Sequence, residues 1–235
     1  MDYIDLRIAK TYIPGKGMGF IATENISNDT IIIKEKPLTN IKDNIVYSDI
    51  FQLLYEILKN KQLSIKFNKL QPKSLQDYSF NKGKKERILS ELKSLETHNS
   101  EIYSFLIENF NQEEILLYCA KYICNAFQFD NKPVILFNGT IFNHSCLPNV
   151  IFGQNGSQMY FMTCRNILKG EEICDNYIDI ISNKKERQLQ LKEQYGFVCQ
   201  CERCNDKNSK KYDNKVLMIE MRRKKLFGFT KSQQI

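Results

Sequence analysis

The sequence of 235 residues has neither a long apolar run nor an apolar block near its start. A helix that spans a bilayer needs roughly 20 consecutive apolar residues, and a secretory signal needs an apolar segment behind basic residues. The first ten residues, MDYIDLRIAK, include acidic side chains instead. Internal repeats and low-complexity segments are also missing. We therefore expect a protein that neither spans a membrane nor carries a signal peptide.

A large excess of charge of one sign is missing too. The chain has 34 basic and 27 acidic residues, which gives a formal net charge of +7. A charge of this size permits acidic or nucleic-acid partners without arguing for them, and a solvated lysine-rich surface is the simpler explanation. Hydrophobic residues make up 42% of the chain, as in ordinary globular proteins. The chain can therefore bury a core, as one domain with or without appendages.

The apolar pattern changes from strand-like to helical and back along the chain. Short β-branched runs bounded by Gly, Asn and Asp indicate strands within residues 3–40, and helical spacing follows from about residue 41 to 126. Farther on, Asn155-Gly156 predicts a tight hairpin turn. Asn183 and Glu186 then have the spacing of a capping box that starts a helix. These patterns predict a helical insertion in a β fold.

The eight cysteines, in a chain without a secretory signal, indicate a reducing compartment and favour metal ligands over disulfides. Cys199, Cys201 and Cys204 form a C-x-C-x-x-C cluster, which can aim three thiolates at one ion. Structural zinc takes four ligands in a tetrahedron, so a fourth must come from elsewhere, and Cys146 is our candidate. The alternative is a set of unliganded structural cysteines. We expect the remaining cysteines to be buried small hydrophobes: Cys119, Cys124, Cys164 and Cys174.

Five motifs follow one another in a telling order: GKGMG, NAF, NHSCLPN, GEEICDNY and CQCERC, at residues 15–19, 125–127, 143–149, 170–177 and 199–204. This order resembles the SET-domain methyltransferases, most closely their SMYD (SET and MYND) branch. The resemblance implies a mainly β SET fold of small sheets with a pseudoknot, here with a helical insertion and a zinc-bound post-SET segment, α+β overall. It also implies S-adenosylmethionine as methyl donor and a protein lysine as acceptor.

The resemblance divides the chain into five segments. These are an N-terminal part of the SET core at 3–40, a helical insertion at 41–118, a C-terminal SET core at 119–182, a helix with the post-SET zinc segment at 183–206, and a basic tail at 207–235. Residues 41–118 contain no cysteine, so we expect no MYND finger. Only about thirty residues follow Cys204, so we also expect no helical C-terminal domain of the SMYD type.

The family's motifs also assign roles to single residues. Cofactor contacts fall on seven residues: Lys16, Gly17, Met18, Asn143, His144, Tyr177 and Phe197. Glycine lets the backbone approach a ligand, the lysine can pair with a carboxylate, and an amide or imidazole gives directed hydrogen bonds. Tyr177 is expected to align the acceptor amine, and Tyr195 to wall the lysine channel as a second catalytic residue. Cys146, Cys199, Cys201 and Cys204 are the expected zinc ligands.

The sequence thus favours a protein-lysine N-methyltransferase that uses S-adenosylmethionine and zinc. Two other classes stay open: a catalytically inactive binding or scaffold module on the same fold, and a zinc protein that binds nucleic acid, suggested by Arg222 to Lys225. We expect a monomer in the nucleus or cytoplasm. Its partner is expected to be a protein substrate with a lysine, with no membrane and no direct nucleic-acid contact.

Overall fold

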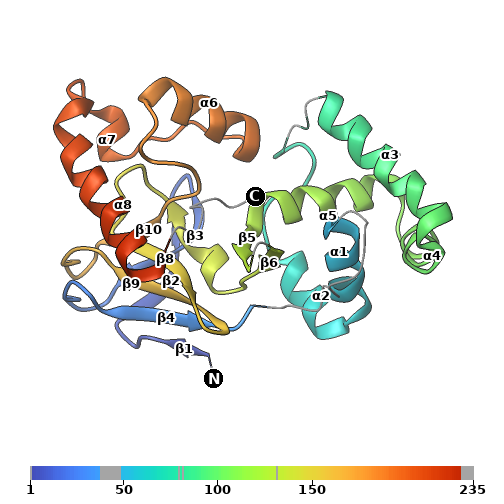
Figure 1. Cartoon of the computed structure of the whole chain (residues 1–235), viewed down its shortest axis with the longest axis horizontal. Helices are drawn as coiled ribbons and strands as arrows, with labels where there is room; N and C mark the ends of the chain where they lie inside the picture. The colour runs from blue at the N-terminus through green and yellow to red at the C-terminus, as the bar shows by residue number, and fades with distance from the viewer. Residues whose placement is uncertain (1, 38–48, 79, 81, 131, 229–235) are drawn as a thin grey trace. The chain divides into compact units, whose positions relative to one another are not determined.

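The computed structural model describes residues 2–37, 49–78, 80, 82–130 and 132–228, in two compact units (Figure 1). Of these residues, the core unit contains 2–37, 136–192 and 197–228, and the helical unit contains the described residues from 49 to 135 together with 193–196. The expected boundary at residue 40 and the end of the basic tail lie outside the described residues. Among the described residues, no helix is both long and apolar enough to cross a membrane.

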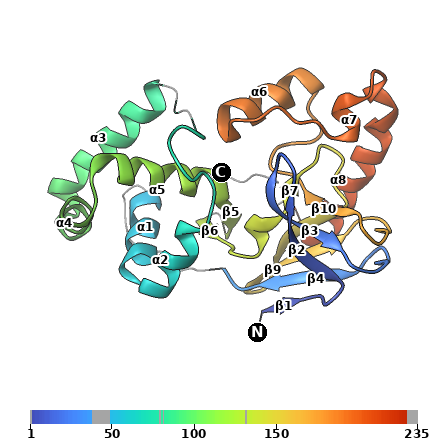
Figure 2. The same ribbon diagram turned by 180° about the vertical axis from the view of Figure 1, so that it is seen from behind.

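The strands of the core unit form two small sheets. One sheet has the order β1-β4-β9-β8, and the other has the order β2-β3-β10-β7. Figure 2 shows β2 and β3 paired as a hairpin. The bounds are β1 (Tyr3–Ile4), β2 (Ile8–Ile13), β3 (Gly17–Ala22), β4 (Ile31–Glu35), β7 (Asn143–His144), β8 (Val150–Asn155), β9 (Gln158–Thr163) and β10 (Glu172–Asp175). Each sheet therefore contains strands from before and from after the helical segment. This agrees with the prediction of helices inserted into a β fold.

Local sequence explains the main turn and the core of this unit. Gly156 has a φ of 59°, and β8 pairs with β9 directly across the turn, so the predicted Asn155-Gly156 hairpin is confirmed. The ring of Phe142, before β7, lies 5.0 Å from those of Phe20 and Phe161. These buried aromatic contacts link β3, β9 and the segment that leads into β7.

The C-terminal part of the core unit is helical. Asn183 and Glu186 each accept a hydrogen bond from the other's backbone N–H, which confirms the predicted capping box at the start of α6. Gly196, with a φ of 78°, follows the last residue of this helix. The bounds are η1 (Gly139–Ile141), α6 (Lys184–Tyr195), α7 (Glu202–Asn205), η2 (Ser209–Tyr212) and α8 (Asp213–Phe227). Residues 213–227 of the expected basic tail thus form a helix, which packs on β8.

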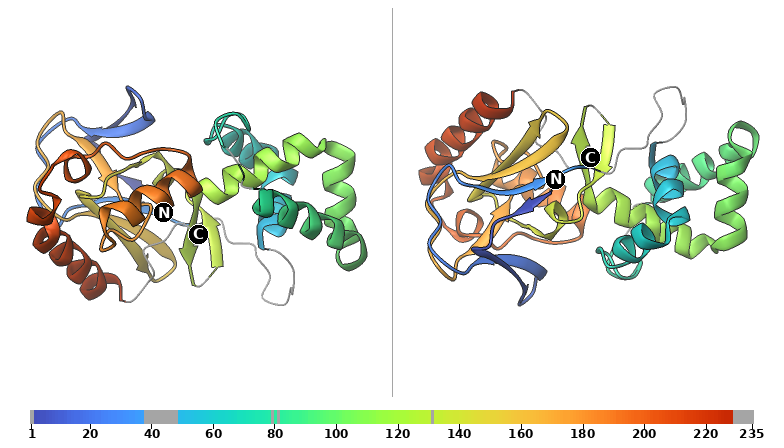
Figure 3. Two further views of the ribbon diagram at one scale, coloured as in Figure 1. Left: turned by 90° about the horizontal axis from the view of Figure 1, so that it is seen from above. Right: turned by 90° about the horizontal axis from the view of Figure 1, so that it is seen from below.

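The helical unit consists of packed helices followed by one hairpin. Helix α5 packs against α1 and α3 (Figure 3). It begins with a capping box of Asn111 and Glu114 and ends where the β5-β6 hairpin starts. The bounds are α1 (Asp49–Lys59), α2 (Lys61–Asn68), α3 (Lys82–His98), α4 (Ser100–Asn109), α5 (Gln112–Asn125), β5 (Ala126–Phe129) and β6 (Lys132–Ile135). The predicted combination of small sheets with inserted helices is confirmed.

Candidate active site and metal centre

The pairing of β7 with β10 brings the NHSC motif against the GEE-to-tyrosine motif. The two strands are parallel, with Asn143 opposite Cys174 and His144 opposite Asp175. The backbone N–H of Tyr177 donates to Nδ1 of His144 at 3.0 Å. Two motifs that lie some thirty residues apart in the sequence therefore form one local structure.

The ring of His144 connects this structure to a cysteine. Burial lowers the pKa of His144 to about 3, so the imidazole is neutral near pH 7. Because Nδ1 accepts the Tyr177 N–H, the single ring proton must sit on Nε2, which lies 3.2 Å from Sγ of Cys146. Both ring nitrogens of His144 are therefore engaged within the protein. A contact of this residue with a cofactor would come from its backbone or its ring face.

The rings of His144, Tyr177 and Phe197 lie close together. The ring centroid of Tyr177 lies 5.3 Å from that of His144 and 6.4 Å from that of Phe197, and the last two are 6.1 Å apart. The hydroxyl of Tyr177 donates to the carbonyl oxygen of Phe142 at 2.6 Å. A hydroxyl has one proton, so toward any further group this oxygen acts as an acceptor. Such an oxygen suits the orientation of an amine N–H or a polarised methyl C–H.

The other end of the predicted cofactor site is polar. Nζ of Lys16 lies 2.5 Å from Oε2 of Glu172, and Nδ2 of Asn143 donates to Oε1 of the same carboxylate at 3.0 Å. Lys16 lies in the β2–β3 turn, while Gly17 and the exposed Met18 begin β3. A ligand carboxylate that pairs with Lys16 would therefore have to displace Glu172 from Lys16 or share Lys16 with it.

The carboxylate of Glu172 contacts both Lys16 and Asn143, although the sequence motifs predicted no role for it. Its place in the GEE motif was the one signal that could have indicated such a role. Gly19, in β3, is fitted closely to the same group. A Cβ atom on this glycine would lie 2.5 Å from Nδ2 of Asn143. Only a glycine leaves room for the amide at this distance, so the turn and Asn143 are built to fit each other.

Tyr195 is assigned to the other compact unit. It is half-buried at the end of α6, and residues 193–196 belong to the helical unit. The structure therefore brings together Asn143, His144, Tyr177 and Phe197 from the predicted set, with Lys16 linked to them through Glu172.

The predicted cysteine cluster is assembled in the core unit. The sulfur atoms of Cys146, Cys199, Cys201 and Cys204 all lie within 4.8 Å of one another, and Cys146 is 3.5 Å from Cys204 and 4.0 Å from Cys199. Four thiolates around a tetrahedral zinc, with bonds of about 2.3 Å, have sulfur atoms roughly 3.8 Å apart. The donor set and its spacing therefore fit a structural zinc ion.

The remaining cysteines lie outside the cluster. Cys119 and Cys174 are buried, whereas Cys124 and Cys164 are half-buried. Burial raises the pKa of Cys124 and Cys164 to about 12 and raises those of Cys119 and Cys174 still farther. All four thiols therefore stay protonated near pH 7. None of the four has the character of a reactive thiolate.

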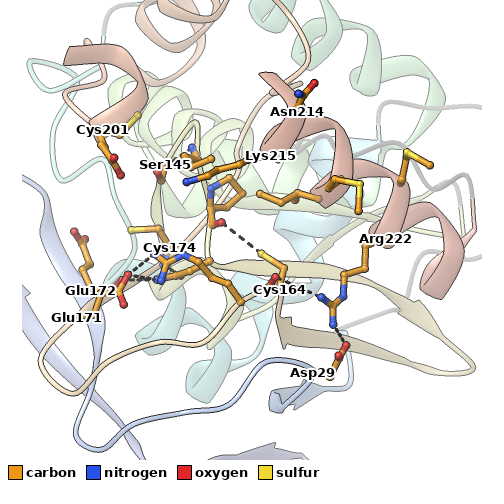
Figure 4. Close-up of a pocket in the computed structure, with 18 of the residues that line it drawn as sticks. Asp29, Ser145, Cys164, Glu171, Glu172, Cys174, Cys201, Asn214, Lys215 and Arg222 are labelled. Carbon is orange, nitrogen blue, oxygen red and sulfur yellow. Dashed lines mark hydrogen bonds and ion pairs between the residues drawn. The ribbon is translucent and has the colours of Figure 1, made fainter. Parts of the chain in front are cut away.

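A cavity of about 1410 Å³ lies next to this site, between the NHSC turn and α8 (Figure 4). Ser145, Cys174 and Cys201 line one side, and Lys215 and Arg222 reach in from α8. Lys16 also lines it, but His144, Tyr177 and Phe197 do not. The cavity is therefore separate from the three aromatic rings. It is lined instead by Lys16 and Glu172, the ion pair at the polar end of the predicted cofactor site.

The chain is similar to known proteins of one family. The family model described as SET domain matches residues 17–178. A SET domain-containing protein of Acanthamoeba polyphaga mimivirus is 47% identical over 201 residues, which cover 85% of this chain and 78% of that protein. The N-lysine methyltransferase SMYD2 of Homo sapiens is 28% identical over 134 residues, covering 54% of this chain and 30% of that enzyme. The chain thus spans less than a third of SMYD2.

A solved structure confirms the fold. The SET domain of LSMT bound to lysine and AdoHcy superimposes with a TM-score of 0.60, at 12% identity, and covers 84% of this chain and 54% of that one. An identity this low supports the fold alone. The predicted fold of small sheets with inserted helices and a cysteine cluster after them is therefore confirmed.

Proposed function

The chain belongs to the SET domain family and is related to the SMYD lysine methyltransferases, and from this we propose that it methylates the ε-amine of a lysine in a protein, with S-adenosylmethionine as donor. One observation carries the proposal. Tyr177, His144 and Phe197 meet at ring distances of 5.3 to 6.4 Å, and the Tyr177 hydroxyl is fixed by the carbonyl of Phe142. Relatives named as lysine methyltransferases and a lysine-bound SET structure support the choice of acceptor.

When bound, S-adenosylmethionine supplies a methyl group on a sulfonium, open to in-line displacement by a neutral amine. The residues of this chain position the partners. The hydroxyl of Tyr177 donates its proton to the carbonyl oxygen of Phe142. Its oxygen can therefore accept hydrogen bonds from the amine N–H and from the polarised methyl C–H groups. Lys16 can pair with the carboxylate of the donor's amino-acid end, and Asn143 can hydrogen-bond to the same end. For this, Glu172 must give up its contacts with the two residues or share them with the donor. Phe197 offers an aromatic face for the adenine.

The acceptor must lose a proton before it reacts. A lysine has a pKa of about 10.4 in water, and transfer into a partly buried site next to a sulfonium lowers it. The site itself thus favours the neutral amine, and no general base is required of the protein. We assign Tyr195 the role of a wall of the lysine channel, in line with its position just before Phe197 in the sequence.

We further propose that the cysteine cluster binds one zinc ion, which would supply a crosslink between the NHSC turn and the C-x-C-x-x-C segment. His144 extends this link to the active site, because it contacts Cys146 on one side and Tyr177 on the other. The metal would thereby hold the Tyr177 backbone and the Phe197 segment in register.

The test is transfer of label from methyl-labelled S-adenosylmethionine to a lysine peptide array. Wild type should label lysine peptides, and Tyr177→Phe should lose at least about tenfold in rate, because the positioned hydroxyl contributes more than roughly 1.4 kcal/mol to alignment. Binding of S-adenosylmethionine to both proteins is measured by calorimetry. Normal cofactor binding without any transfer by wild type, on the array and in cell lysate, would refute the enzymatic role.

A scaffold module on the same fold is the alternative, favoured by the ion pair between Lys16 and Glu172, which already neutralises the expected carboxylate-binding cation. This alternative predicts that wild type binds no S-adenosylmethionine. The same calorimetric titration therefore separates the two functions, since only the enzyme requires a saturable heat of binding.

A further inference from the structure

Two arginine side chains are almost fully buried beside the cysteine cluster. Arg187, in α6, is 1% exposed, and Arg203, between Cys201 and Cys204 in α7, is 3% exposed. A guanidinium stays charged at any physiological pH, and its transfer out of water is costly unless a compensating charge lies close by. Each arginine therefore requires a counter-charge inside the protein.

Arg187 finds no such charge among the carboxylates of the described residues. Its Nη1 donates to the carbonyl oxygen of Ser182 at 2.5 Å, its Nη2 points at Sγ of Cys204 at 3.9 Å, and its Nε has no partner. A carbonyl oxygen carries only a partial charge. The sulfur atoms are therefore the groups that can carry the missing negative charge.

Arg203 has two carbonyl oxygens and one carboxylate as partners. Its Nη1 donates to the carbonyl oxygens of Ile180 at 2.6 Å and Cys146 at 3.3 Å, and its Nη2 lies 3.3 Å from Oδ1 of Asp213. The Asp213 side chain is 60% exposed, so solvent screens much of its charge. This single, solvated carboxylate leaves the buried arginine only partly compensated.

A third buried arginine shows how the fold treats such a group away from the cluster. Arg223, in α8, lies 2.8 Å from Oε2 of Glu220, and both side chains are at most 5% exposed. A buried carboxylate thus provides the full counter-charge there. The contrast indicates that the counter-charge of Arg187 and Arg203 is supplied by a different group, the thiolates.

We propose that Arg187 and Arg203 are the counter-charge of the zinc–tetrathiolate centre and set how tightly the metal is held. Four thiolates and one Zn²⁺ carry a net charge of −2, and the two guanidiniums carry +2, so the buried assembly is neutral. Arg187 also donates toward Cys204, and a hydrogen bond of this kind makes a thiolate less basic. The proposal rests on the zinc site proposed above.

The neutral assembly has a consequence for the active site. Arg187 lies in α6, and the chain runs from this helix directly to Phe197 and Cys199. The ionic contact between Arg187 and the cluster therefore fixes α6 relative to the segment that carries Phe197. Arg187 acts on the active site as a positioning residue, through the metal centre.

The test measures zinc release from purified, zinc-loaded protein into a chromogenic chelator. Arg187→Met keeps the length and packing of the side chain without its charge, and Arg187→Lys keeps the charge. Loss of an outer-shell partner costs about 10- to 100-fold in metal affinity, so we expect release from Arg187→Met to be faster by roughly that factor. Arg187→Lys should retain most of the wild-type behaviour. Acid titration should show the Met variant losing zinc at higher pH, because more basic thiolates are protonated earlier.

Arg223→Met is the matched control, since it removes an equally buried guanidinium away from the cluster. It should lower the melting temperature without faster zinc release. Release from Arg187→Met at the wild-type rate, or equal acceleration in Arg187→Met and Arg187→Lys, would overturn the proposal, because packing rather than charge would then matter. Zinc analysis of wild type separates this failure from that of the metal site, which would show as no zinc in the unmodified protein.

Discussion

At the scale of single residues, the site depends on polar groups that are each tied to a neighbour. Tyr177 donates its hydroxyl proton to Phe142, and His144 has a partner on both ring nitrogens. Such groups are pre-oriented, so they need not reorganise when partners bind. The residues expected to act in the reaction are therefore also residues whose positions the fold determines.

Gly19 is the residue where this fit is tightest. In Gly19→Ala, the new Cβ would lie 2.5 Å from Nδ2 of Asn143 and 2.9 Å from Cγ1 of Ile13, so Asn143 must move. We expect the dissociation constant for S-adenosylmethionine to rise about tenfold, which corresponds to about 1.4 kcal/mol, as measured by calorimetry. Gly156→Ala is the control, because it strains a turn with a positive φ in open space. Wild-type affinity in Gly19→Ala would show that the position of Asn143 does not matter for binding.

Glu35 gives the core unit a dependence on pH. Its carboxylate accepts the backbone N–H groups of Asn138 and Gly139 at 2.9 to 3.0 Å, yet burial raises its pKa from 4.5 to about 7. Between these two values the folded protein binds more protons than the unfolded chain, so stability falls as pH rises through the interval. At about 1.4 kcal/mol per pKa unit, the loss is at most roughly 3.5 kcal/mol.

Glu35→Gln should remove this contribution, because the amide stays neutral and its oxygen still accepts backbone N–H groups. The measurement is the free energy of unfolding by urea, at about pH 5 and about pH 8. The wild type should lose more stability than Glu35→Gln over this range. Identical losses in the two proteins would rule out Glu35 as the source.

At the scale of elements, α8 packs closely on β8 of the sheet. A Cβ on Gly153 of β8 would lie 2.3 Å from Cγ of Phe227 at the end of α8. Gly153→Ala should therefore displace the helix and cost about 1–3 kcal/mol of stability, as overpacking does. Hydrogen exchange should show faster amide exchange within residues 213–227. The double variant with Phe227→Ala should restore slow exchange, and continued fast exchange in it would place the cause elsewhere.

The post-SET segment depends on the cysteine cluster in the same way. Cys201→Ser should lose zinc, by elemental analysis, and weaken S-adenosylmethionine binding, because local folding and metal binding are coupled. Cys164→Ser, outside the cluster, is the control and should keep its zinc. A Cys201→Ser protein with full zinc content and full activity would contradict the assigned ligand set.

The same elements show what the sequence could predict. C-x-C-x-x-C and NHSC predicted the cysteine cluster, because closely spaced thiols have few uses in a reducing compartment. The sequence could not reveal the burial of Arg187, since a single arginine in a charged helix looks solvent-exposed until the fold buries it. The helical structure of the expected basic tail was also not evident from the sequence: its Met and Leu residues show no clear helical face, and contacts such as that between Gly153 and Phe227 exist only in the folded chain.

At the scale of the whole molecule, the chain combines a core unit with an inserted helical unit. The grouped residues of the proposed active site and all of the proposed zinc ligands lie in the core unit. The SET domain match runs from residue 17 to 178, so Phe197 and three of the four cysteines follow it in the sequence. The chain covers 78% of its viral relative but only 30% of SMYD2. The proposed chemistry thus lies within the core unit.

The most direct test of the central claim is mass spectrometry of lysine methylation. Proteins of a cell lysate are incubated with S-adenosylmethionine and either wild type or Tyr177→Phe, with cofactor binding by both enzymes checked first. We predict methylated lysines that appear with wild type and are strongly reduced with Tyr177→Phe. If the two samples carry the same lysine methylation although both proteins bind the cofactor, this chain is not a protein-lysine methyltransferase that acts through Tyr177.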